Sequence, residues 1–397
     1  MTSAAEDTNR AAKAAAASVI EKRLPELVAL SHSVHSTPEL CFAETVSSRT
    51  VADALRAGGL TVDEGVYEID TAFEARSGSG EFVVALCAEY DALPVVGHAC
   101  GHNIIAASAV GAALALAAVA DEVGLTMRIL GTPAEEGGGG KVFMLDRGAF
   151  EGVHAAMMVH PWPVERLTGA CLAVTHFDVH FVGMEAHASA APWQGVNALD
   201  AMTISQVALG LLRQQLPPGD QVHGIITQGG GAANVIPAAV SGRYMARSKT
   251  IEGLRALEPR VRACFEAGAL ATGCSVTFEE LAPVYSHMEA DAGLLAAYRL
   301  NAESLGRTFE ADDEDAPLPT FSTDMANVSL AVPTIHPLIG IETHGAVNHQ
   351  HEFAAACITP SADAAVRDGA LGLAWTAIDA ATDRALRSRL LGAGARS

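Results

Sequence analysis

The feature that most constrains the fold is a succession of an apolar strand, a long Ala-rich helix and a second apolar strand. Residues 81–88 (EFVVALCA) form a continuous apolar run of strand length, and residues 127–132 (MRILGT) form another. The small apolar residues of 104–120 lie between them. This order predicts a parallel sheet, in which a right-handed crossover brings the carboxyl ends of both strands to one edge. Ligand sites collect at that edge, so the residues after the two strands are the first candidates for chemistry.

The apolar run also has to be weighed as a membrane span. Residues 104–120 reach only the short limit for a span, and their side chains are small. A central helix packed against a sheet fits better, because small residues allow close approach. At the N-terminus, Glu6, Asp7 and Lys13 interrupt the apolar stretch that a signal peptide needs, so we expect a solvated helical lead-in and no secretion.

Charge and cysteine content narrow the partners and the compartment. The chain has 46 acidic and 25 basic residues, for a formal net charge of −21 at pH 7. That charge repels nucleic acid and anionic membranes, so we expect neither as a partner. The 7 cysteines are odd in number and scattered over 397 residues, which is typical of free thiols in a reducing compartment. We therefore expect a cytoplasmic protein.

The pattern of the chain changes at about Val174. Strand and helix signals then follow in the order strand, helix, strand, strand, helix, strand. We predict an α/β fold with a discontinuous catalytic domain (1–173 and 290–397) whose mixed, mostly parallel sheet is flanked by helices. An inserted α+β domain of βαββαβ order (174–289) would form a lid and dimerisation domain. The acidic, Pro-containing segment 310–319 is expected to be a solvated loop.

Two polar clusters follow the two predicted strands. Cys100 and His102 come after the first strand, and on an extended chain residues two apart point to one side. Glu135 and Glu136 come after the second strand, before four glycines. Adjacent carboxylates at the end of a buried strand are costly unless a cation or a proton uses them. On an extended backbone they would face different ways, so one can hold a metal while the other acts as a base.

Two further clusters add histidines. His160 follows the apolar run AAMMVH, and NHQHEF (348–353) lies far downstream. A lone histidine is more often structural, but Cys, His, Glu and His donors at four predicted strand ends indicate a metal site. A phosphate-binding loop is excluded, because its pattern requires Gly at 135 and Ser or Thr at 142, where Glu135 and Val142 stand.

Seven runs together resemble the M20 metallopeptidase and amidohydrolase family: AEYDALPVVGHACGHN, PAEEGGGG, VHPWP, GMEAHASAAPWQGVNALDA, GGAANVIP, STDMANVS and NHQHEF. They lie in the family's order over residues 30–365, and they are most similar to the aminoacylase-type branch with a Cys metal ligand. Within it they resemble the subgroup of aminobenzoyl-glutamate hydrolase and M20-domain dipeptidase-like proteins. The resemblance implies two divalent metal ions, Zn²⁺ or Mn²⁺, bound by Cys100, His102, Glu136, His160 and His349.

The resemblance also implies roles for residues around the metals. Glu135 would be the general base, and His187 would donate to the tetrahedral oxyanion, often from the partner subunit of a dimer. Asn234 would hydrogen-bond the carbonyl or carboxylate region of the substrate, and Arg247 would bind its carboxylate. Asp91 would hydrogen-bond a metal ligand.

Some assignments stay open. His351 is a rival to His349, which is preferred because the family places the ligand four residues before an aromatic, here Phe353. Arg243 is a rival to Arg247. Glu89 stands where the peptidase branches carry a metal-binding His, so this chain would rely on Cys100 and His102 instead.

Function follows from these assignments. We predict a metal-dependent amidohydrolase that cleaves the amide bond of an N-acyl amino acid or dipeptide with a free carboxylate, active as a homodimer through the lid domain. The alternatives are an amidase for non-peptide N-acyl amides and an inactive, metal-bound binding protein. Retention of Glu135 and of all five predicted ligands argues against the inactive relative.

Overall fold

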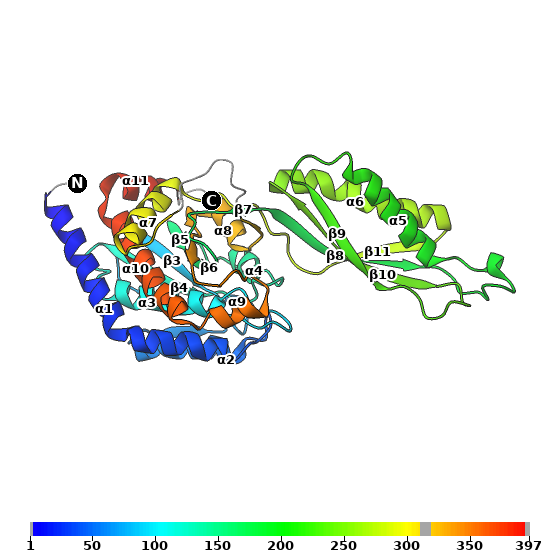
Figure 1. Cartoon of the computed structure of the whole chain (residues 1–397). Coiled ribbons are helices and arrows are strands. Elements are labelled where there is room, and N and C mark those ends of the chain that lie inside the picture. The colour runs from blue at the N-terminus through cyan, green and yellow to red at the C-terminus, as the bar shows by residue number, and fades with distance from the viewer. Residues whose placement is uncertain (1–2, 310–318, 394–397) are drawn as a thin grey trace. The chain divides into compact units, whose positions relative to one another are not determined.

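The computed structural model describes residues 3–309 and 319–393, which form two compact units (Figure 1). Unit 1 comprises Met1–Gly169, Met288–Pro319 and Thr323–Ser397, and unit 2 comprises Ala170–His287 with Thr320–Ser322. The acidic segment 310–319, expected to be a loop, lies outside the described residues except for Pro319.

Unit 1 is built on a six-stranded sheet of order β1-β2-β4-β3-β5-β13. The central strands β4, β3, β5 and β13 run parallel to one another, while β2 pairs antiparallel with β4 and with β1. The predicted α/β class with a mixed, mostly parallel sheet is therefore confirmed. The strands are β1 Val62–Glu64, β2 Phe73–Ser77, β3 Phe82–Ala88, β4 Leu125–Gly131, β5 Ala155–Met157 and β13 Thr334–Ile335; β6 His160–Trp162 pairs separately with β14 Leu338–Gly340.

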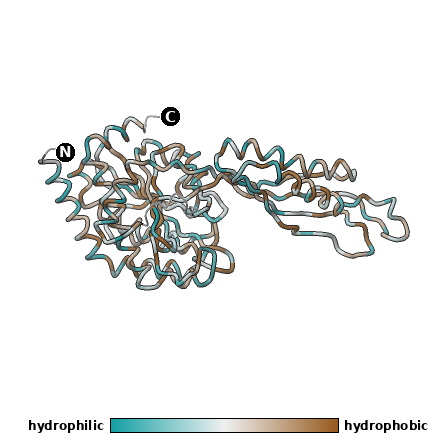
Figure 2. The backbone as a smooth tube through the Cα atoms, turned by 45° about the horizontal axis from the view of Figure 1, so that its top comes forward, coloured by the Kyte–Doolittle hydropathy of each residue, from teal (hydrophilic) through white to brown (hydrophobic). Residues whose placement is uncertain are grey.

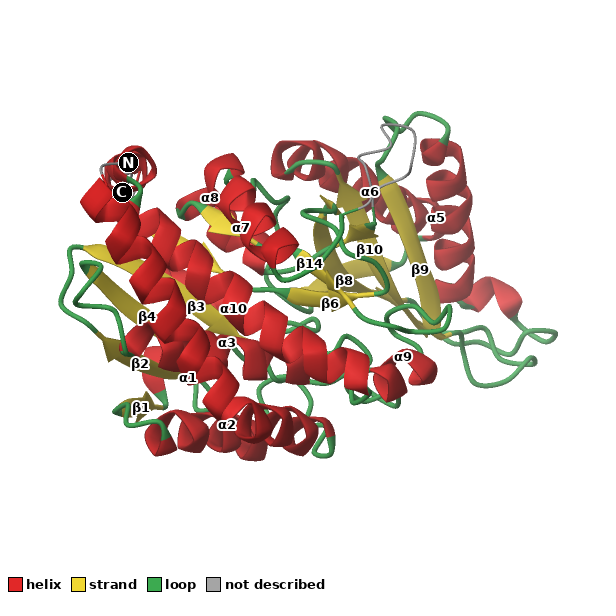
Figure 3. Ribbon diagram, turned by 60° about the vertical axis from the view of Figure 1, so that its left-hand side comes forward, coloured by secondary structure: helices red, strands yellow, loops and turns green. Residues whose placement is uncertain are grey.

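The predicted strand–helix–strand unit is present as β3, α3 (His102–Ala117) and β4, with β3 and β4 in parallel register. Helix α3 is buried on every side from His102 to Leu116, because it packs against α1 (Ser3–His35), α10 (Pro360–Thr382) and the strands β3 and β4 (Figure 3). A Cβ atom on Gly111 would lie 2.8 Å from the Cβ of Ala370 and 2.9 Å from a Leu27 methyl. The small residues of this run therefore serve close helix packing.

The N-terminal helix differs from the expectation of a solvated lead-in. Ala12, Ala16 and Ile20 of α1 are fully buried in the core of unit 1. Their spacing of four residues places them on one helical face, and small side chains let that face approach α10 and α3. The prediction of a helix is confirmed, but the prediction that it is merely solvated is wrong.

The remaining helices of unit 1 lie around its sheet. The apolar segments of unit 1 gather in the interior (Figure 2). These helices are α2 Thr45–Ala57, α4 Gly140–Asp146, α7 Ala292–Ser304, α8 Met325–Ala331, α9 His351–Ala356 and α11 Arg384–Ala393, with a 3₁₀ turn at Val66–Glu68. Among the described residues, none of the helices has the length and apolar content that crossing a membrane requires.

Unit 2 contains an antiparallel sheet of order β11-β8-β10-β9, with α5 and α6 packed on one face. In β8 the buried Phe177, Val179 and Phe181 alternate with partly exposed residues, so the face away from the helices is polar. The elements are β8 Ala173–Val182, α5 Ala198–Arg213, β9 Gln221–Gln228, β10 Ala239–Ser248, α6 Ile251–Thr272 and β11 Ser275–Glu280, with a 3₁₀ turn at Pro192–Gln194; β7 Ala170–Cys171 pairs with β12 Thr320–Phe321.

Candidate metal centre

The loop after β3 carries the first two predicted ligands. Cys100 precedes Gly101, whose φ is +74°, and His102 then begins α3. The sequence-based assumption of an extended chain is wrong here, because a left-handed turn links the two residues. A Cβ atom on Gly101 would lie 2.4 Å from Pro161, so the turn is possible only with glycine.

The loop after β4 carries Glu135 and Glu136, and it too is a turn and not an extended segment. Ala134 has a φ of +62°, which is uncommon for a residue with a side chain. Buried carboxylates hold this loop: Glu44 Oε1 accepts the Ala134 N–H at 2.8 Å, and Asp91 Oδ2 accepts the Glu136 N–H at 2.8 Å. The direction of the two glutamates therefore comes from these hydrogen bonds.

Among the residues that the structure describes, three sets of side chains, all in unit 1, are close enough to hold a metal ion, with ligand atoms within 4.8 Å of one another. The first two sets share Cys100 and together contain all five predicted ligands. The third set was not predicted. The sets are Cys100, His102 and His160; Cys100, Glu136 and His349; and Glu89, His102 and Glu135.

His349 contacts the other predicted ligands and the loop that carries Cys100. It has a φ of +71°, its N–H donates to the Ala99 carbonyl at 2.9 Å, and its Nε2 lies 4.0 Å from Glu136 Oε2. The rival His351 begins α9, and its side chain is in none of the three sets formed by the described residues.

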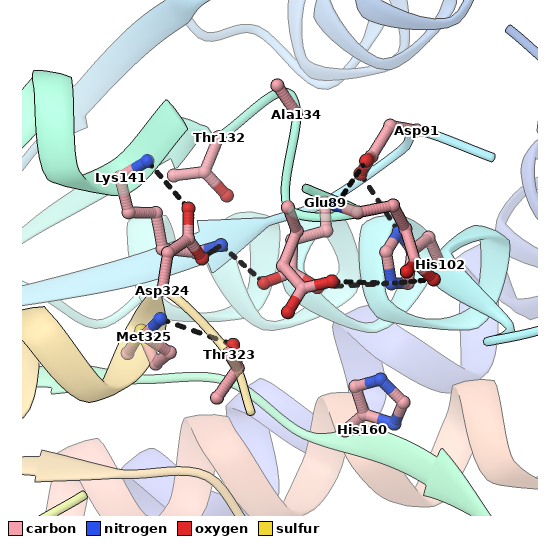
Figure 4. Close-up of polar contacts among 12 residues, drawn as sticks. Glu89, Asp91, His102, Thr132, Ala134, Lys141, His160, Thr323, Asp324 and Met325 are labelled. Carbon is pink, nitrogen blue, oxygen red and sulfur yellow. Dashed lines mark hydrogen bonds and ion pairs between the residues drawn. The ribbon is translucent and has the colours of Figure 1, made fainter. Parts of the chain in front are cut away.

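Asp91 orients His102 (Figure 4). Its Oδ1 lies 3.0 Å from Nδ1 of the ring, which leaves Nε2 directed toward other carboxylates. Burial alone would lower the pKa of His102, but the charges of Asp91, Glu89 and Glu136 raise it well above its usual value. A histidine held at Nδ1 by a carboxylate is the arrangement that presents Nε2 to a metal ion.

The acids of this site share one electrostatic problem. Burial, followed by the charges of Glu136 and Glu89, raises the pKa of Glu135 well above its usual value. Burial also raises the pKa of Glu136, and it raises the pKa of the Cys100 thiol well above its usual value. Buried acids in such number need compensating positive charge, which a divalent cation supplies.

A buried ion cluster next to this site was not predicted from sequence. Lys141 Nζ lies 2.5 Å from Glu89 Oε1 and 2.7 Å from Asp324 Oδ1, and all three side chains are 0% exposed. The sequence marks Glu89 as a departure from the family, and Asp324 lies in STDMANVS, one of the runs that resemble the family. Only the fold shows that Lys141 joins them.

The other predicted residues lie in unit 2. His187 Nδ1 accepts N–H groups of Ser189 (3.3 Å) and Ala190 (3.2 Å), so Nε2 is the nitrogen that carries a proton to donate. The Asn234 carbonyl accepts the Ala188 N–H at 3.0 Å, which ties the two loops together. Both side chains are exposed.

The two candidate arginines differ in their partners. Arg243 already forms a two-pronged ion pair with Asp178, at 2.8 and 2.9 Å. Arg247 donates to Ser322 Oγ at 2.7 Å, and no carboxylate among the described residues lies within ion-pair distance of it. Burial lowers the pKa of Arg247, as expected for a cation without a counterion. This contrast favours Arg247 as the carboxylate-binding residue.

Known proteins are similar to this chain in sequence and in fold. The chain is 37% identical to Xaa-Arg dipeptidase of Mus musculus over 92% of this chain and 88% of that protein. It is 33% identical to one component of the p-aminobenzoyl-glutamate hydrolase of Escherichia coli (strain K12), over 62% of this chain and 56% of that protein.

Solved structures share the fold. One is a dinuclear metal-binding peptidase of the M20 family from Bacillus subtilis, with a TM-score of 0.69 and 21% identity over 90% of this chain and 98% of that chain. Another is an aminobenzoyl-glutamate utilization protein from Klebsiella pneumoniae, with a TM-score of 0.71 and 19% identity over 91% and 97% of the two chains. Residues 85–367 match the model of peptidase family M20/M25/M40, and the chain belongs to this family of hydrolases that act on C–N bonds.

Proposed function

We propose that the protein is a metal-dependent amidohydrolase that cleaves an amide bond next to a free carboxylate, in an N-acyl amino acid or a dipeptide. The observation that carries the proposal is the pair of side-chain sets that share Cys100, one of which contains Glu136, with the buried Glu135 next to Glu136 in the chain. Hydrolysis by two metal ions needs such a shared set of ligands and a base close to it.

The donors fit two divalent ions. Thiolate and imidazole favour Zn²⁺, while the mixed Glu and His set also tolerates Mn²⁺. When bound, the ions would polarise the amide carbonyl and lower the pKa of the attacking water. The proposed ligands are Cys100, His102, Glu136, His160 and His349.

Glu135 is the proposed general base. Its carboxylate Oε2 lies 3.8 Å from His102 Nε2, so it stands at the edge of the ligand set. It would take a proton from the attacking water and give that proton to the leaving amine. The pKa of Glu135, which burial and neighbouring charges raise, suits a group that must both accept and return a proton.

Residues of unit 2 would recognise the substrate. The Arg247 guanidinium can bind a carboxylate with two parallel hydrogen bonds. His187 would donate from Nε2 to the oxyanion that forms on the carbonyl, and Asn234 would hydrogen-bond the same region. A substrate with a free carboxylate is consistent with the names of both relatives, a dipeptidase and an aminobenzoyl-glutamate hydrolase.

The test is a substrate panel with the purified chain loaded with Zn²⁺ or Mn²⁺. The panel contains dipeptides, including some that end in Arg, N-acyl amino acids, aminobenzoyl-glutamate and non-peptide aromatic N-acyl amides. Each carboxylate substrate is paired with its methyl ester. We expect hydrolysis of free acids and little hydrolysis of esters. Preference for the non-peptide amides would favour the alternative amidase, and absence of metal binding would refute the proposal.

We also propose that the chain forms a homodimer through a surface of unit 2. Strand β9 is an edge strand of its sheet, and Ile225 on it is 64% exposed. On α5, Val207 and Leu211 are 60% and 68% exposed. Unpaired edge strands and exposed apolar side chains are typical of association surfaces. Light scattering should show a dimer for the natural chain and a monomer for the Val207→Glu/Leu211→Glu variant, and a monomeric natural chain would contradict the proposal.

A further inference from the structure

Three carboxylates, those of the buried Glu89 and Glu135 and of the partly buried Glu136, lie near Nε2 of His102, the ring nitrogen that Asp91 does not hold. His102 Nε2 lies 3.5 Å from Glu89 Oε2, 3.8 Å from Glu135 Oε2 and 3.9 Å from Glu136 Oε1. By distance alone, each of them could bind a metal ion held by His102. Their other partners must therefore decide which carboxylate does.

Glu89 differs from the predicted ligand Glu136 because an ammonium group holds it. Lys141 Nζ lies 2.5 Å from Glu89 Oε1, while the other oxygen faces His102 (Figure 4). The ion-pair partners of Glu136 are instead two histidines, His102 at 3.9 Å and His349 at 4.0 Å, which are themselves predicted ligands. The charge of Glu89 is thus partly compensated by a lysine of the protein, which Glu89 shares with Asp324.

Lys141 is itself fixed from both ends. Asp324 accepts its backbone N–H with Oδ2 at 2.8 Å and its ammonium with Oδ1 at 2.7 Å. Both side chains are 0% exposed, so bulk solvent does not reach these bonds. An ammonium buried between two carboxylates is kept in one position, because losing either partner would leave a buried charge uncompensated.

We propose that Lys141 is a positioning residue that keeps Glu89 out of the metal ligand set. This inference rests on the proposed metal site. With Glu89 held by Lys141, the ions would be left to Cys100, Glu136 and the histidines, and a coordination position would stay open. Catalytic metal sites need such an open position for water and substrate.

The proposal makes an unusual prediction for Lys141→Met. Without the ammonium, Glu89 would become an additional ligand, so metal affinity should rise roughly 10- to 100-fold, the scale on which groups around a ligand set change affinity. The kcat should fall because the open position is filled, while KM should change little. A residue that only supports folding would weaken metal binding and activity together.

The experiment measures Zn²⁺ affinity of metal-free protein by competition with a chelator, and the spectrum of the Co²⁺-loaded protein. The matched control is Arg307→Met, because Arg307 is another cation of unit 1 between two carboxylates, Glu165 (3.0 Å) and Asp368 (2.9 Å). This control should lose stability and keep the natural metal affinity and Co²⁺ spectrum.

Two further variants keep the proposal falsifiable even if Lys141→Met does not fold. Glu89→Gln alone should change metal affinity by well under the roughly tenfold expected for a group of the ligand set. Combined with Lys141→Met, it should restore the natural affinity and spectrum. A tenfold loss in Glu89→Gln would show that Glu89 is a ligand in the natural protein, and unchanged or weaker affinity in Lys141→Met would also overturn the proposal. If the natural chain bound no metal, the proposed function itself would fail.

Discussion

The candidate residues of the two units differ in their burial and in whether their side chains already have charged partners within the chain. In unit 1 the Asp91, His102 and Glu135 side chains are buried, and Asp91 and Glu135 each lie close to the His102 ring, although the predicted ligand His349 is exposed. In unit 2 His187 and Asn234 are exposed, and Arg247 has no carboxylate partner among the described residues. Burial strengthens electrostatic interactions because the local dielectric constant is low, which suits chemistry. Exposed groups on loops can bind and release a ligand. Under the proposed function, the residues of unit 1 would carry out the reaction and those of unit 2 would recognise the substrate.

The largest effect that would test this division is expected from Glu135→Gln. Removing a positioned acid–base residue typically costs 10²- to 10⁴-fold in rate, so kcat should fall by that factor while metal content and KM stay close to natural. The control Glu165→Gln removes another buried carboxylate of unit 1, one that pairs with Arg307. It should leave kcat intact. Nearly full activity of Glu135→Gln on every substrate would refute the proposed base.

Glu44 provides the next largest effect, on stability. Burial, together with the charge of Asp91, raises its pKa to about 7. Because the unfolded pKa is close to 4.5, the folded protein binds more protons between pH 4.5 and 7. The free energy of unfolding should therefore fall as pH rises through this window, by up to about 3 kcal/mol. In the metal-free protein, Glu44→Gln should remove this pH dependence of the stability of unit 1.

Hydrogen exchange of the buried α3 amides in metal-free protein, compared at pH 5 and pH 7.5 after correction for intrinsic rates, measures this effect. The exposed Glu122→Gln serves as the control and should behave like the natural chain. The same pH dependence in Glu44→Gln and the natural protein would exclude this role for Glu44.

Sequence patterns predicted the centre of unit 1 better than its periphery. The β3–α3–β4 unit was predictable because continuous apolar runs identify buried strands and a buried helix. Strand β1 has only three residues, Val62–Glu64, which is too short for a periodic signal. The burial of the start of α1 was missed because Ala12 and Ala16, the first residues of its packing face, stand among other alanines and charged residues, and alanines alone do not mark a core.

The site was predictable where one residue type carries the chemistry. Cys100, the histidines and the paired glutamates are identifiable as metal donors in any local conformation, although the extended backbone assumed for them was wrong. The Glu89–Lys141–Asp324 cluster was not predictable, because it joins three segments far apart in the chain. A lysine after four glycines carries no signal of its own until the fold places it between two acids.

In unit 2, Arg247→Met should mainly raise KM. A hydrogen bond to a charged group is worth about 1.5–3 kcal/mol, so KM for free-acid substrates should rise roughly 10- to 150-fold with little change in kcat. The esters should be unaffected. Arg243→Met is the control, because Arg243 is already engaged by Asp178. If the two variants had equal effects, Arg247 would not be the carboxylate-binding residue.

The smallest expected effect has the opposite pH dependence to that of Glu44. Burial, with the charges of Arg247 and His223, lowers the pKa of His176 to about 4. Its unfolded pKa is close to 6.5, so the unfolded state binds more protons between pH 4 and 6.5, and the stability of unit 2 should fall as pH falls through this window. Because His176 is partly exposed, we expect roughly 1–2 kcal/mol and not the full value of the shift. His176→Gln should remove the loss, as measured by hydrogen exchange of β10 amides at pH 4.5 and pH 7. His180→Gln, on the same strand and face, is the control, and an equal response in both variants would show that the effect does not belong to His176.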